Sequence, residues 1–172
     1  MSKKIRILGI DTSLRSTGYG IVDLFENGSM NAIDCGVVKN KAKLSQLDCL
    51  KRLHVAITQL IELYKPDHIS IEGTFYSKFA KTAMILGMAR GSVLSALAGT
   101  DLPVWEYSPK RAKQAITGSG DASKEQVAFM IAGILQADVS QINDDATDAL
   151  ALAVCHGQAI LSPTSGKLGI QL

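Results

Sequence analysis

Short apolar runs separated by turn residues open the chain and predict three strands. The runs cover Ile5–Asp11, Thr17–Leu24 and Asn31–Val38, and the turn-like segment Glu26–Ser29 separates the second run from the third. Because short turns join successive antiparallel strands, we expect these three runs to form an antiparallel meander.

A longer segment follows, in which apolar residues recur at helical spacing. Its leucines, isoleucines and final tyrosine lie between residues 44 and 64, and Lys65-Pro66 ends the pattern. The next apolar run, His68–Glu72, predicts a fourth strand. A helix that links two strands of one sheet normally makes a right-handed crossover, so this strand should run parallel to its neighbour.

The second half of the chain predicts one more strand and four helices. In chain order these are a helix over 78–98, a strand over 102–107, a short helix that opens at Pro109, a helix over 123–135, and a last helix from Asn143 or Asp144 to about Leu161. The predicted fold class is α/β, with a mixed five-stranded sheet flanked by helices. We expect one domain over residues 1–161 and a loose tail over 162–172.

Composition is consistent with a single domain. The chain has 172 residues, of which 47% are hydrophobic, enough for one sizeable core. Apolar runs stay well short of the roughly 20 residues that a membrane span requires, and the basic start leads directly into a strand, so we expect a cytoplasmic protein without membrane contact. The three cysteines are far apart and lack CxxC spacing, which predicts neither a disulfide framework nor a zinc site.

Basic residues concentrate in the middle of the chain, although the net charge is only +2. Residues 77–124 contain seven Lys and Arg against three Asp and Glu, whereas the rest of the chain contains eleven against thirteen. A basic middle segment is suited to contact with phosphates, but solvated basic surfaces are also common in proteins that bind no nucleic acid.

Four acidic residues occupy positions that the predicted fold would bring together. Asp11 ends the first strand and Glu72 ends the fourth, at the sheet edge where α/β proteins bind ligands. Asp145 and Asp148 are three residues apart, so they share one face of the last helix, beside small residues that let this helix approach the sheet. We therefore expect these four carboxylates to form one cluster.

Such a cluster points to metal-ion chemistry. Confined carboxylates repel one another, which implies bound cations or shared protons. Oxygen ligands suit Mg²⁺, with Mn²⁺ as a substitute, and two ions about 4 Å apart can activate a water and stabilise the leaving oxygen of a phosphodiester. The expected reaction is in-line phosphodiester hydrolysis with two ions per active site.

The alternative interpretation of the acids is structural. Asp11 could cap a turn, Glu72 could be an exposed strand end, and Asp144 and Asp145 could favour a helix N-terminus. Capping does not explain Asp148, which lies beside a buried apolar stripe.

Several fragments, in order, resemble the RuvC family of RNase H-like nucleases. Gly9-Ile10-Asp11, followed by Thr17-Gly18-Tyr19-Gly20-Ile21, is similar to the acid and hairpin of the first strands in that family. The later fragments that agree are Ile71-Glu72 with Phe75, Leu86–Gly91, Pro103–Tyr107 and Asp145–Ala151. The resemblance covers roughly Ile5 to His156. Thr12-Ser13-Leu14 departs from it, because the family usually has Pro-Gly-Ser there.

The resemblance implies a homodimer that cuts four-way DNA junctions with two symmetric nicks, in recombination and DNA repair, in partnership with RuvA and RuvB. It implies that Asp11, Glu72, Asp145 and Asp148 are the metal-binding catalytic residues.

Three further residues become candidates for DNA contact through the same resemblance. Lys113 and Lys124 would contact phosphates, and Phe75 would stack on an unpaired base at the crossover. The structural alternatives are a solvated helix face for the lysines and a core position for Phe75. Arg15, close to Asp11 in sequence, could contact DNA or point to solvent.

Three other functions remain open at the level of sequence. The acids alone are equally compatible with an RNase H-like nuclease that cuts another substrate, such as an RNA–DNA hybrid. A non-catalytic junction-binding module is a second alternative. An actin-like phosphate-binding hairpin at Asp11–Gly18 is a third, although such proteins need two lobes and this chain has room for one.

Overall fold

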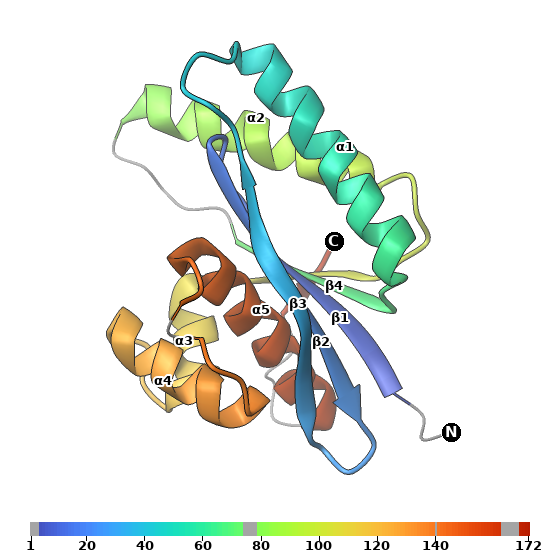
Figure 1. Cartoon of the computed structure of the whole chain (residues 1–172), viewed down its shortest axis with the longest axis vertical. Coiled ribbons are helices and arrows are strands. Elements are labelled where there is room, and N and C mark those ends of the chain that lie inside the picture. The colour runs from blue at the N-terminus through green and yellow to red at the C-terminus, as the bar shows by residue number, and fades with distance from the viewer. Residues whose placement is uncertain (1–3, 74–78, 140, 163–168) are drawn as a thin grey trace.

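The computed structural model describes residues 4–73, 79–139, 141–162 and 169–172 of the chain. Its centre is a mixed sheet of six strands in the order β3-β2-β1-β4-β5-β6, with helices on both faces (Figure 1). The strands are β1 Lys4–Asp11, β2 Ser16–Phe25, β3 Met30–Lys39, β4 His68–Glu72, β5 Val104–Tyr107 and β6 Ile170–Gln171. The helices are α1 Gln46–Tyr64, α2 Ala80–Leu97, α3 Pro109–Thr117, α4 Lys124–Leu135 and α5 Asp144–Leu161.

The first three strands form the expected antiparallel meander. β1 pairs antiparallel with β2, and β2 pairs antiparallel with β3. After the α1 crossover, β4 lies parallel to β1, and β5 lies parallel to β4. The α/β class and the mixed sheet predicted from the sequence are therefore confirmed.

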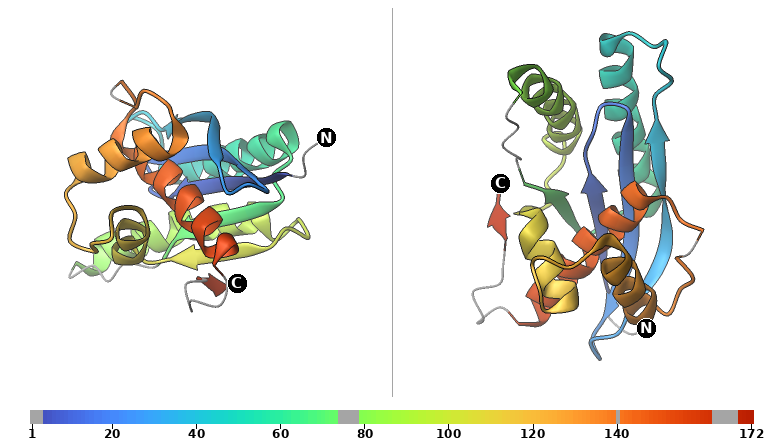
Figure 2. Two further views of the ribbon diagram at one scale, coloured as in Figure 1. Left: turned by 90° about the horizontal axis from the view of Figure 1, so that it is seen from below. Right: turned by 90° about the vertical axis from the view of Figure 1, so that its left-hand side faces the viewer.

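Alternating residues of β1 divide the core into two layers. Leu8 and Ile10 pack against α1 and α2, whereas Ile7 belongs to the core formed with α4 and α5. The two further views show α1 and α2 over one face and α5, flanked by α3 and α4, over the other (Figure 2). Of the helices in the described ranges, none combines the length and apolar character needed to cross a membrane.

Glycines allow α5 to lie directly on the meander. A Cβ atom at Gly9 would stand 2.0 Å from the carbonyl oxygen of Ala149, and one at Gly18 would stand 1.9 Å from the carbonyl oxygen of Asp145. No other residue type leaves room for this approach. The first turn of α5 is thereby held over the end of β1, where the acidic residues were expected.

A buried polar chain anchors the second half of α5. His156 is fully buried, with Nε2 2.8 Å from Nδ1 of His68 and Nδ1 2.8 Å from the hydroxyl of Tyr107. Burial and the neighbouring His68 lower the pKa of His156 to about 3, so the ring is neutral at physiological pH. The contacts of His156 with His68 and Tyr107 therefore hold α5 against β4 and β5.

The predicted strand count of five was one too few. β6 pairs antiparallel with β5 through Trp105 and Glu106, and the backbone N–H of Leu172 donates to the carbonyl oxygen of Val104 over 2.9 Å. The end of the segment expected as a loose tail thus joins the sheet. Its two paired residues are too few to produce an alternating pattern, and backbone hydrogen bonds leave no signature in side-chain type.

Candidate active site

Asp11 and Glu72 lie side by side at the carboxyl ends of β1 and β4. The parallel register pairs Ile10 with Ile71, so the next residue of each strand is an acid at the same edge. The two half-buried side chains are hydrogen-bonded to each other. The sequence-based expectation that these two carboxylates converge is confirmed by this geometry.

The first turns of α5 bring the other two acids to the same edge. Asn143 caps the helix, since its side-chain oxygen accepts from the backbone N–H of Asp145 over 2.9 Å; Asp144, the other candidate cap, does not fill this position. The carboxylate of Asp145 accepts from the hydroxyl of Ser16, whereas that of Asp148 lies 3.3 Å from the ammonium of Lys124. Sequence reasoning did not find Ser16, because a serine in a hairpin carries no distinguishing signal.

The acids interact electrostatically across the three elements. Burial is the largest of several effects that together raise the pKa of Asp11 to about 8; the others are the charges of Glu72, Asp148 and Asp145 and the hydrogen bond with Glu72. Burial also raises the pKa of Glu72, against the opposing effects of Arg90 and Lys124. The acids therefore lie close enough to oppose one another's ionisation.

This donor set fits a hard divalent cation, although its side chains are not yet arranged around one. Across the described ranges, no three acidic, histidine or cysteine side chains already converge closely enough to hold a single metal ion. The protonated carboxyl group of Asp11 donates to the carboxylate of Glu72, and the ammonium of Lys124 donates to the carboxylate of Asp148. The four acids supply oxygen donors, the type that Mg²⁺ and Mn²⁺ prefer, and a cation would offset the repulsion between their carboxylates.

A hollow of about 210 Å³ opens beside the acids and contains both predicted lysines. Glu72, Asp148, Lys113 and Lys124 all line it. The ammonium of Lys113 donates to the carbonyl oxygen of Ala122 over 3.0 Å. Both lysines therefore lie next to the acids rather than on a remote face. Phe75 lies outside the described residues.

Thr12-Ser13-Leu14, the segment that departs from the family pattern, is held in place by hydrogen bonds and packing. The backbone N–H of Ser13 donates to the hydroxyl of Thr17 over 3.1 Å, and Leu14 is buried beneath α1 and α2. The guanidinium of Arg15 donates to the carbonyl oxygens of Lys41 and Leu44. Arg15 is itself exposed, and these bonds tie the turn after β1 to the segment that follows β3.

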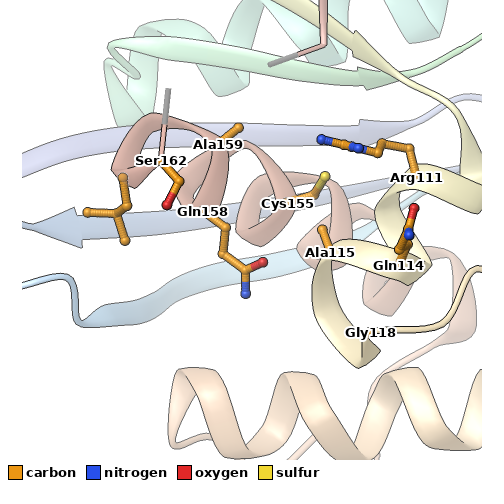
Figure 3. A pocket seen from close by; sticks show the side chains of 9 residues that line it. Arg111, Gln114, Ala115, Gly118, Cys155, Gln158, Ala159 and Ser162 are labelled. Carbon is orange, nitrogen blue, oxygen red and sulfur yellow. The ribbon is translucent and has the colours of Figure 1, made fainter. Parts of the chain in front are cut away.

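A second hollow, of about 430 Å³, lies between α3 and the later part of α5 (Figure 3). The side chains of Arg111 and Cys155 lie in it, as do those of Gln114 and Gln158. Burial raises the pKa of the Cys155 thiol to about 12, so this group is not a nucleophile at neutral pH. The four acids do not line this hollow.

The mixed sheet begins with an antiparallel meander, and acidic residues lie at the carboxyl ends of its strands β1 and β4 and on the helix α5 that covers them. These features define an RNase H-like nuclease. The family model described as crossover junction endodeoxyribonuclease RuvC matches residues 7–156. The chain belongs to this family, whose members are metal-dependent nucleases.

Individual relatives can be aligned with this chain over almost its whole length. The crossover junction endodeoxyribonuclease RuvC of Caldicellulosiruptor saccharolyticus is 38% identical over 94% of this chain and 95% of its own length. The solved structure of Thermus thermophilus RuvC is 28% identical, covers 98% of this chain and 100% of its own, and superposes with a TM-score of 0.85. The same Thermus thermophilus protein in complex with Holliday junction substrate is 27% identical, with a TM-score of 0.86, and covers 98% of this chain and 99% of its own.

Proposed function

We propose that this chain, a crossover junction endodeoxyribonuclease by family, resolves four-way DNA junctions with two symmetric nicks made by metal-dependent phosphodiester hydrolysis. The observation that carries the proposal is the meeting of Asp11, Glu72 and Asp148, from three separate elements, at one half-buried edge. Mutual repulsion makes this arrangement unfavourable for stability alone, which supports a catalytic role.

Asp11, Glu72, Asp145 and Asp148 are the proposed ligands of two Mg²⁺ ions, which Mn²⁺ can replace. Such ions supply an activated water and stabilise the departing 3′ oxygen. The protein holds the carboxylates in place: β1 and β4 position Asp11 and Glu72, and the packing of α5 on Gly9 and Gly18 positions the other two.

Lys113 and Lys124 are the proposed contacts for backbone phosphates. The ammonium of Lys124 offsets part of the negative charge of Asp148 and Asp144, at 3.3 Å and 3.7 Å, and so lowers the repulsion that an approaching phosphate would meet. Lys113 lines the same hollow. Stacking of Phe75 on an unpaired base is proposed from the family resemblance.

We also propose that the chain acts as a homodimer through α2, because two symmetric nicks require two active sites. The outer face of α2 is apolar and exposed, with Met84 63% and Met88 40% accessible. Among the described residues, none would lie within 4 Å of a Cβ atom at Gly87 or at Gly91, so a second helix could approach closely there.

Gly87→Glu is expected to weaken dimerisation by roughly 100-fold or more, because a two-fold axis would place two like charges in one apolar contact. Light scattering across a dilution series measures this change. Gly133→Glu is the matched control, since Gly133 is also an exposed helical glycine with no Cβ neighbour and lies on α4. Persistence of the dimer in Gly87→Glu would assign dimerisation to another surface.

The direct test of the function is cleavage of a labelled four-way junction and of a linear duplex with the same sequence, in Mg²⁺ and in EDTA. We expect paired nicks near the crossover of the junction, and loss of all cutting in EDTA. Equal cutting of the linear duplex would contradict selectivity for four-way junctions but not the nuclease activity. Binding without cutting, across junctions of varied sequence, would favour the non-catalytic module.

Partnership with RuvA and RuvB, and a role in recombination and repair in the cytoplasm, follow from the family resemblance. A pull-down of the two proteins on junction DNA tests the partnership.

A further inference from the structure

Arg90 joins α2 to the two strand ends that carry and flank Glu72. Its guanidinium donates through Nη1 to the backbone carbonyl oxygen of Glu72 and through Nη2 to the carboxylate of Glu106 on β5. The side chains of Arg90 and Glu106 are only 13% and 19% exposed. Because both ends of the guanidinium fork are engaged and sheltered from solvent, Arg90 is poorly placed to bind a DNA phosphate.

Glu106 lies beside the backbone that follows Glu72. In the β4–β5 register, Ile71 pairs with Glu106 and Glu72 pairs with Tyr107. The backbone N–H of Gly73 then donates to the carbonyl oxygen of Tyr107 over 2.8 Å, and a Cβ atom at Gly73 would lie 3.1 Å from Oε1 of Glu106. The end of β4 is therefore bonded to Arg90 through the carbonyl of Glu72 and to β5 through the N–H of Gly73, while Glu106 binds Arg90 and lies next to Gly73.

We propose that Arg90, paired with Glu106, is a positioning residue that holds the end of β4 so that the carboxylate of Glu72 lies beside Asp11. This inference rests on the proposed function, since it assigns Glu72 to the metal site. Residues that hold a metal ligand from behind typically change metal affinity or activity by about 10- to 100-fold when they are removed.

Arg90→Gln tests this role, with Arg52→Gln as the matched control. Arg52 is also a bonded arginine, donating from Nε to Asn40 over 2.9 Å, but it lies on α1 away from the acids. The first readout is the increase in melting temperature as Mg²⁺ alone is added. The Mg²⁺ concentration that gives half of the full increase should be about tenfold or more higher in Arg90→Gln, and should remain unchanged in Arg52→Gln. The second is cleavage, where kcat should fall by about tenfold or more while junction affinity in EDTA stays constant.

Two further variants separate positioning from general stability. Arg90→Lys keeps the charge without the two-pronged fork, so it should lie between wild type and Arg90→Gln. Glu106→Gln should also raise the Mg²⁺ concentration that is required, but by a smaller factor. In the double variant Arg90→Gln with Glu106→Gln, this increase should be smaller than the two single increases combined, because the two residues act as a pair. If Arg90→Gln does not fold, Arg90→Lys and Glu106→Gln provide the same comparison.

The inference is overturned if folded Arg90→Gln, or these two substitutes, keep the wild-type Mg²⁺ dependence and kcat. That result with an active wild-type enzyme would leave the proposed function intact. Failure of the wild-type chain to cut any junction in Mg²⁺ would instead contradict the proposed function itself.

Discussion

Asp148→Asn is expected to abolish junction cleavage and to leave junction binding unchanged or slightly tighter. The amide keeps the shape of the side chain on α5 but lacks the negative charge that a divalent cation requires. Loss of a metal ligand removes several kcal/mol of transition-state stabilisation, which corresponds to a rate lower by about 10³-fold or more. Removal of one negative charge also reduces repulsion of the DNA backbone.

Single-turnover cleavage and a binding titration in EDTA measure the two effects separately. Asp144→Asn is the control, because Asp144 is also in the first turn of α5 and near Lys124, but its side chain is 77% exposed. We expect this control to cut at close to the wild-type rate. A wild-type cleavage rate in Asp148→Asn would exclude Asp148 from the catalytic residues. An equal fall of the cleavage rate in both variants would indicate that the negative charge of this region matters, rather than metal binding by Asp148.

Gly9→Ala is expected to destabilise the fold by about 3 kcal/mol or more, or to prevent folding. The added methyl group would stand 2.0 Å from the carbonyl oxygen of Ala149 and 2.9 Å from the backbone nitrogen of Ala153. Both atoms belong to the backbone of α5, so a change of side-chain rotamer cannot relieve the clash. Any relief lifts α5 from the sheet and displaces Asp145 and Asp148.

Urea denaturation followed by circular dichroism measures the change in free energy of unfolding. Gly133→Ala on α4 is the control: nothing lies within 4 Å of its Cβ position, so alanine should raise the free energy of unfolding by up to about 1 kcal/mol. Wild-type stability in Gly9→Ala would mean that α5 does not pack on β1 as closely as the structure has it.

Local patterns were sufficient to predict most elements of this fold. The meander, the α1 crossover and the last helix were recognisable because residue periodicity and capping act over a few positions. The β6 strand was not recognisable, since Ile170 and Gln171 are bound through backbone groups of β5. The hydrogen-bond partners of Arg15 were also not predictable from the sequence, because these carbonyl groups lie 26 and 29 residues away.

The amino-acid sequence by itself determined which acidic side chains are candidates for catalysis and on which elements they lie. Asp11 and Glu72 stand at strand ends and Asp148 beside an apolar helix stripe because of local periodicity, and the RuvC resemblance rests on the same residues. Only the tertiary structure decided that these acids meet, that Lys124 bonds to Asp148, and that Arg90 holds the end of β4. The physical reason is that these contacts join positions far apart in sequence, and their geometry depends on sheet register and on the close approach of α5 at Gly9.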